Sequence, residues 1–202
     1  MSLACLAGYV DAVGFLSADR YFVSFMSGNT TRLAVDFATE PRRALIPALL
    51  ILAFVAGVAG GSVVATLAGR RRKQAVLVLV TVLLLAAAVV RLEGSAATSL
   101  GALVLAMGAV NNTFQRDGEI AIGLTYMTGA LVRLGQGLGA ALTGERRTSA
   151  AGYFLLWTGL FGGAVIGALA ATRGGTLALW LAASFAAILT AFSLRLAARG
   201  TG

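Results

Sequence analysis

The sequence predicts an all-α integral membrane protein. Of its 202 residues, 58% are hydrophobic and 12% are charged, whereas an ordinary soluble domain has about 25% charged residues. The mean hydropathy of +0.88 would give a soluble protein large exposed apolar patches. Several apolar runs also reach the length of about 20 residues that a membrane-crossing helix needs. The composition therefore excludes a soluble enzyme, a disordered chain and a disulfide-rich scaffold.

Residue counts also restrict the chemistry. The chain contains no histidine and a single cysteine, Cys5, which excludes an internal disulfide, a Cys-rich metal site and any site that needs histidine. No serine or carboxylate stands in a catalytic spacing with a base, and no Walker-type phosphate loop is present. We therefore expect no enzymatic activity, no metal and no cofactor.

Four apolar runs predict uninterrupted membrane helices: Ala44–Gly69, Gln74–Val90, Ser149–Thr172 and Gly175–Leu194. The second run is short, so we expect the flanking Lys73 and Arg91 to extend toward the membrane interfaces. Two other apolar segments, Leu3–Phe37 and Leu100–Leu142, are interrupted by polar residues. The first of them lacks the basic n-region and the cleavage site of a signal peptide.

The number of crossings depends on the interrupted segments. Each is either one broken helix, which gives six crossings, or two short helices, which give eight. With six crossings one side carries eight Lys and Arg residues and the other side four, whereas with eight crossings each side carries seven. The positive-inside rule favours six crossings, with both termini cytoplasmic in a bacterial inner membrane. The richer side holds Arg70, Arg71, Arg72, Lys73, Arg146, Arg147, Arg195 and Arg199.

The net charge of +8 does not indicate nucleic-acid binding, because the basic residues are not interleaved with aromatic ones on a folded surface. We interpret the charge as orienting the protein in the bilayer.

The two halves of the chain resemble each other. Met26–Ala34 matches Met127–Gly135 at an offset of 101, and Gly57, Gly60 and Gly61 match Gly159, Gly162 and Gly163 at an offset of 102. Three crossings in each copy would turn the second copy upside down, as in secondary transporters with broken first helices. Chance similarity between Gly- and Ala-rich helices is the alternative. We predict one membrane domain, 1–202, with repeats 1–97 and 98–202.

Asp11 is the most informative candidate site residue. It lies inside the first apolar segment, where a charged side chain costs about 2.5–3.5 kcal/mol on insertion scales and normally faces a cavity or a partner. It could carry a proton or meet a cation, with Phe15 one turn later as a cavity wall. Alternatively, its carboxylate binds free backbone N–H groups at the helix break, or pairs with Arg20 or Arg116.

The second half offers amides instead. Aligning Gly8 with Gly108 makes Asn111 the counterpart of Asp11, whereas the later offset makes it Asn112. We favour Asn111. Gln115 follows it by four residues, so these two amides would share a helix face. These amides could hold a solute or join helices by hydrogen bonds.

Two related blocks follow the predicted breaks. Each has a hydroxyl next to a glycine: Ser24, Ser27, Gly28 and Asn29 in the first half, and Thr125, Thr128 and Gly129 in the second. Such residues suit an unwound stretch that faces a cavity, or hydroxyls bonded to their own helix with glycine allowing close packing. Arg32 and Arg133 occupy matching places, as lipid anchors or as an anion clamp.

These residues resemble the motifs of the YoaK-like family of small bacterial membrane proteins, domain of unknown function 1275. The resemblance covers essentially the whole chain and rests on Gly8–Phe15, Phe22–Ser24, Met26–Thr30, Met107, Gly108, Asn111, Arg116, Gly118, Thr125–Gly129, Arg133 and Leu134. It implies the fold more than an activity. The helix count and inverted repeat are also similar to one half of a major-facilitator transporter, which is an analogy of fold alone.

We therefore predict a transporter of a small polar or ionic solute, coupled to protons through Asp11. One six-helix unit is half of that transporter type, so we expect a homodimer around an axis along the membrane normal. A passive channel, and a non-transporting membrane scaffold or assembly protein, are the alternatives. The expected partners are the bilayer, the solute and a second copy.

Overall fold

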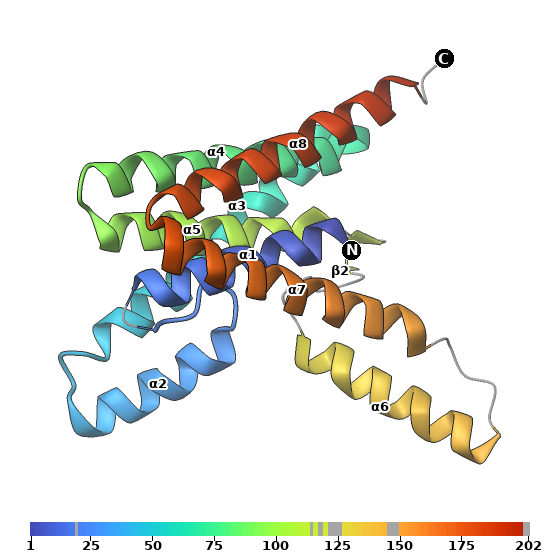
Figure 1. Cartoon of the computed structure of the whole chain (residues 1–202), viewed down its shortest axis with the longest axis horizontal. Coiled ribbons are helices and arrows are strands. Elements are labelled where there is room, and N and C mark those ends of the chain that lie inside the picture. The colour runs from blue at the N-terminus through green and yellow to red at the C-terminus, as the bar shows by residue number, and fades with distance from the viewer. Residues whose placement is uncertain (19, 114, 117–118, 121–126, 145–149, 200–202) are drawn as a thin grey trace.

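The computed structural model describes residues 1–18, 20–113, 115–116, 119–120, 127–144 and 150–199 (Figure 1). Gly118, Thr125, Tyr126, Arg146 and Arg147, which the sequence analysis used, lie outside the described residues. In chain order, the elements are α1 (Ser2–Ser17), α2 (Met26–Thr39), α3 (Leu45–Ala68), η1 (Gly69–Arg71), α4 (Arg72–Leu92), α5 (Ala96–Val110), η2 (Asn111–Thr113), β1 (Gln115–Arg116), β2 (Glu119–Ile120), α6 (Met127–Thr143), α7 (Ala150–Gly174) and α8 (Leu177–Arg199).

The helical fold class is confirmed for the described residues. The four uninterrupted apolar runs form α3, α4, α7 and α8, and the segments long and apolar enough to cross a membrane are Leu45–Leu92, Ala151–Gly174 and Leu177–Arg199. The strands β1 and β2 are only two residues long each and pair antiparallel, with Gln115 opposite Ile120.

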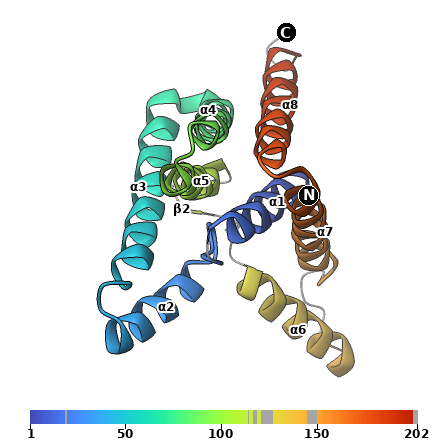
Figure 2. The same cartoon turned by 60° about the vertical axis from the view of Figure 1, so that its left-hand side comes forward.

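Both interrupted segments break. The first stops after Ser17 and resumes as α2 at Met26, and the second leaves α5 after Val110 and resumes as α6 at Met127. Figures 1 and 2 show α2 and α6 diverging from the bundle formed by the other helices. The two termini and the turn between α3 and α4 lie toward the same end of the bundle (Figure 1).

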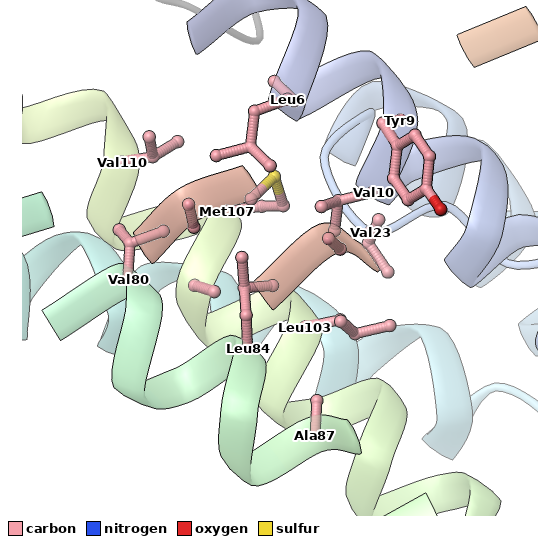
Figure 3. Packing of buried hydrophobic residues seen from close by; sticks show 14 of the residues in the cluster. Leu6, Tyr9, Val10, Val23, Val80, Leu84, Ala87, Leu103, Met107 and Val110 are labelled. Atoms are coloured by element: carbon pink, nitrogen blue, oxygen red, sulfur yellow. The ribbon is translucent and has the colours of Figure 1, made fainter. Parts of the chain in front are cut away.

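The helices of the two halves interlock. The first helix, α1, packs most extensively against α7, while α5 packs against both α3 and α4. The helices α4 and α8 pack against each other, and α2 and α6 contact chiefly α3 and α7, respectively. Between these helices lies an apolar core (Figure 3), whose fully buried side chains include Leu6, Val10, Val80, Leu84, Leu103 and Met107.

Glycines bring the backbones of two helix pairs into contact. In the pair α1 and α7, a Cβ atom added to a glycine would overlap the backbone carbonyl of the facing residue, and the same holds for the pair α3 and α5. Close backbone approach of this kind supplies packing energy in a membrane, where apolar burial does not drive helices together. The contacts are Gly8 with Leu160, Gly163 with Cys5, Gly167 with Tyr9, Gly57 with Leu105, Gly61 with Ala109, and Gly108 with Phe54.

Hydroxyl groups add links between helices. The Tyr9 hydroxyl donates to the Ala178 carbonyl at 3.0 Å, and the Ser99 hydroxyl donates to the Ala87 carbonyl at 2.8 Å. The hydroxyls of Thr81 and Thr190 join α4 to α8 at 2.9 Å. Each link also gives a buried polar group a partner within the protein.

Substitution of Gly57 by alanine is expected to destabilise the protein by about 1–3 kcal/mol, the usual cost of overpacking, because the new Cβ atom would overlap the Leu105 carbonyl. Gly60→Ala on the same helix is the control, since nothing lies within 4 Å of its added Cβ atom. The thermal unfolding midpoint of the purified protein in detergent measures both. Equal shifts for the two variants would contradict the packing of α3 on α5.

Candidate functional site

The chain after α1 turns back along that helix. Arg20 has a positive φ of 61°, and the Tyr21 amide donates to the Ala18 carbonyl at 2.9 Å. Val23 then packs against Gly14 of α1, where an added Cβ atom would lie 2.6 Å from a Val23 methyl group. We call residues 20–25 the return segment. It places non-helical backbone beside the last turns of α1.

Asp11 fastens the return segment to α1. Its Oδ1 atom accepts hydrogen bonds from the backbone N–H groups of Val23 at 3.0 Å and Ser24 at 2.8 Å. Both N–H groups lie outside a helix, so the carboxylate satisfies donors that the break leaves free. This is the structural alternative given above for Asp11. Within the described residues the ion pair is between Arg43 and Glu40, and Arg20 does not pair with Asp11.

Asn29 joins the return segment to α2. Its side chain is fully buried; Nδ2 donates to the Phe22 carbonyl at 2.8 Å, and Oδ1 accepts from the Phe22 amide at 3.2 Å. The amide therefore replaces the two backbone partners that Phe22 would have in a continuous helix.

Aromatic rings cover this junction. The Phe15 and Phe22 centroids are 4.9 Å apart, and those of Phe22 and Phe25 are 5.1 Å apart. An added Cβ atom at Gly28 would lie 2.5 Å from the Phe25 ring, so glycine is needed for this approach. The predicted residues Asp11, Phe15, Gly28 and Asn29 thus meet around the return segment.

Arg32 closes the same region from α2. Its guanidinium lies 4.3 Å from the centroid of the Tyr21 ring and donates to the Arg20 carbonyl. Ser27, in the first turn of α2, is exposed, and its carbonyl accepts the Thr31 hydroxyl at 3.2 Å.

The amides of the second half lie in a separate group. Asn111 and Asn112 are buried after the end of α5. Nδ2 of Asn111 donates to the Met107 carbonyl at 2.9 Å, and Nδ2 of Asn112 donates to the Val58 carbonyl of α3 at 3.0 Å. The second bond joins two helices, as amides in membrane helices commonly do.

The other predicted residues of the second half are not brought to these amides by any described contact. Gln115 begins β1, and its side chain lies outside the described residues. Thr128 is exposed and Gly129 is half-buried in the first turn of α6. One turn further, the Arg133 guanidinium lies 5.6 Å from the Tyr153 ring centroid.

Two cavities lie between α1, α4, α7 and α8, at opposite ends of these helices. One, of about 280 Å³, is lined by Lys73, Leu77 and Phe192 among others, and the other, of about 390 Å³, by Ser17, Arg91 and Thr176 among others. None of the predicted site residues whose side chains the structure describes lines either cavity. Sequence reasoning assigned Lys73 and Arg91 to the membrane interfaces, because nothing in the local pattern indicates that four distant segments converge on them.

Asn29→Ala is expected to destabilise the fold by about 1–3 kcal/mol, the cost of leaving a buried polar group without a partner. The variant removes both hydrogen bonds to Phe22. Thr30→Ala on the same helix is the control, because the exposed Thr30 hydroxyl bonds only its own helix at Met26. Thermal unfolding in detergent and limited proteolysis near residue 22 measure the difference. Equal stability of the two variants would contradict the role of Asn29 in stabilising this junction.

Comparison with known proteins agrees with this membrane fold. Residues 1–192 match the family described as "Protein of unknown function (DUF1275)". The chain is 40% identical over 198 residues to the UPF0700 transmembrane protein RA0705 of Rhizobium meliloti (strain 1021). The aligned region covers 98% of this chain and 86% of that relative. No solved structure matches. The chain is thus a multi-pass protein of the lipid bilayer, and it belongs to the DUF1275 family.

Proposed function

We propose that this protein transports a small polar or ionic solute across the bacterial inner membrane, using two inverted three-crossing repeats. The observation that carries the proposal is the reciprocal packing of α1 on α7 and of α5 on α3. Thus α1, the first helix of the first half, lies against α7 of the second half, and α5, the first helix of the second half, lies against α3 of the first half. Inverted repeats with broken helices are a common plan of secondary transporters.

The glycine contacts support the repeat in detail. Gly8 meets Leu160, and Gly108 meets Phe54, so the first-helix residues differ by 100 and the third-helix residues by 106. The same two offsets relate the contact of Gly57 with Leu105 to that of Gly163 with Cys5. They also relate Gly61 with Ala109 to Gly167 with Tyr9. Three matched pairs of contacts with the same two offsets are difficult to attribute to composition.

These offsets refine the alignment made from sequence. They pair Gly57 with Gly163, whereas the sequence pattern had paired it with Gly159. The offset of 100 in the first helix supports Asn111, rather than Asn112, as the counterpart of Asp11. The helices after the breaks begin at Met26 and Met127, 101 residues apart. The change of offset along the chain reflects connections of different length.

Six crossings follow if α1 with α2, and α5 with α6, each count as one. An even number agrees with the position of both termini toward one end of the bundle (Figure 1). The basic turn Arg70–Lys73 joins α3 to α4 at that end as well, so the positive-inside rule makes it cytoplasmic.

The return segment can couple the binding of an ion at Asp11 to a conformational change. Its two hydrogen bonds to Asp11 are charge-assisted and so are stronger than bonds to a neutral acceptor. A proton or cation on the carboxylate would weaken them and favour a conformation in which the return segment leaves α1. A solute that binds this conformation better would shift the population further. The activity is transport rather than catalysis.

A second copy would complete the transport unit. The helices α2 and α6 diverge from the bundle (Figure 2), and an added Cβ atom at Gly135 or Gly139 of α6 would meet nothing within 4 Å. Close approach of a second backbone is therefore possible along α6. We propose a homodimer with its axis along the membrane normal.

A membrane scaffold or assembly protein is the second candidate function. It is favoured by the fact that Asp11, Asn29 and Asn112 all bind backbone groups, as groups that only stabilise a fold would do. The two functions differ in whether the return segment moves.

Asp11→Asn is expected to fold but to lose transport at least about tenfold, because a neutral amide cannot be switched by a proton. Purified protein in liposomes that contain a pH-sensitive dye is offered amino acids, carboxylic acids, sugars and polyamines in turn. Asp36→Asn, an acid-to-amide change in α2, is the control and should retain solute-driven pH changes. Identical behaviour of the two variants would contradict the role of Asp11.

Ser24→Cys in a Cys5→Ser background tests movement without knowledge of the solute. Ser24 is buried at 7% exposure, so a static scaffold would protect the thiol on both sides of the membrane. A carrier is expected to expose it in turn to a membrane-impermeant maleimide in right-side-out and in inside-out vesicles. Leu67→Cys, on an exposed position of α3, controls for vesicle orientation. Protection from both sides would overturn alternating access at this site.

A further inference from the structure

The cavity of about 390 Å³ lies at the end of the bundle opposite the termini. Four segments line it: the end of α1, the end of α4, the end of α7 and the turn into α8. Its polar side chains are Ser17, Arg91, Thr172 and Thr176, and Leu16 and Leu179 supply apolar walls.

Arg91 is the charged group of this cavity. It is half-buried, and within the described part of the chain it makes no ion pair and no side-chain hydrogen bond. None of the carboxylates in the described part of the chain lines the cavity. A guanidinium in this position can offer a planar pair of N–H donors to an anionic oxygen group.

Hydroxyl groups line the same cavity as the guanidinium. The hydroxyls of Ser17 and Thr176 make no hydrogen bond among the described residues, so both can donate to a ligand. The Thr172 hydroxyl already donates to the Ala168 carbonyl at 2.9 Å, which leaves only its lone pairs toward the cavity. Together with Arg91, the Ser17 and Thr176 hydroxyls give the cavity side-chain donors from which an anion can accept hydrogen bonds.

We propose that this cavity binds the carboxylate or phosphate group of the transported solute, with Arg91 as its charge partner and Ser17 and Thr176 as hydrogen-bond donors. The inference rests on the proposed transport function and gives it a substrate class, small organic or inorganic anions. The cavity between the same four helices at their other end is lined by a cationic side chain as well, Lys73. An anion would thus meet a positive group at either end of this helix interface.

Binding of inorganic phosphate and of succinate tests the inference without any flux. Each is titrated against the full chain in neutral detergent at constant ionic strength, and the rise in thermal unfolding midpoint gives an apparent Kd. Arg91→Gln is expected to weaken binding at least about tenfold, the effect of losing one strong charge-assisted contact. Arg91→Lys keeps the charge without the planar pair of donors and should lose less.

Arg173→Gln is the matched control, since Arg173 is an exposed arginine in the last turn of α7 that does not line the cavity. It should bind both anions as the parent does. Absence of binding by the parent, or equal weakening in the Arg91 and Arg173 variants, would overturn the site.

A lipid headgroup carries the same chemistry, so a second arm compares the parent and Arg91→Gln in nanodiscs of phosphatidylglycerol and of phosphatidylcholine. Stabilisation by phosphatidylglycerol that depends on Arg91, without binding of free anions, would overturn a solute site. Loss of anion binding with intact Asp11-dependent transport would reject the substrate class alone. Anion binding with a protected Ser24→Cys thiol would reject transport and keep the anion site.

Discussion

The structure depends on one constraint: backbone N–H and C=O groups exposed at a helix break inside a membrane have to find partners within the protein. The chain breaks after Ser17, and the return segment would otherwise present unpaired amides to the hydrocarbon layer. Asp11 satisfies two of them and Asn29 satisfies both backbone groups of Phe22. The polar side chains of this apolar segment thus make its irregular backbone possible.

The same constraint explains why the rest of the fold is packed through glycines. A short return segment leaves α1 without a helical neighbour of its own half along much of its length, so α1 packs against α7 of the other half. Gly8 and Gly163 let the two backbones touch, which is the main source of helix attraction in lipid. Loss of these glycines would therefore weaken the packing of α1 on α7.

Much of this architecture could be predicted from sequence, because long apolar runs specify membrane helices almost independently of their neighbours. The helices α3, α4, α7 and α8, and both breaks, follow from such runs. The partners of Asp11 could not be predicted, since they depend on the return segment folding back. Under the proposed repeat, Gly57 corresponds to Gly163 rather than to Gly159, and pattern matching could not resolve this because loops of different length change the offset between the halves. The surroundings of Arg91 depend on four segments far apart in sequence.

A purely structural role accounts for the charge of Asp11 only through the strength of its hydrogen bonds to Val23 and Ser24. An asparagine at this position could accept the same two N–H donors and would cost less to place in the hydrocarbon layer. Under the proposed repeat, the amide Asn111 takes the corresponding place in the other half, and its side chain donates to the Met107 carbonyl of its own helix. A carboxylate in one half and an amide in the other make the two breaks respond differently to a proton or a cation. Such an asymmetry is of use to a protein whose first break moves during a cycle, whereas a static scaffold would gain from it only stronger hydrogen bonds at the first break.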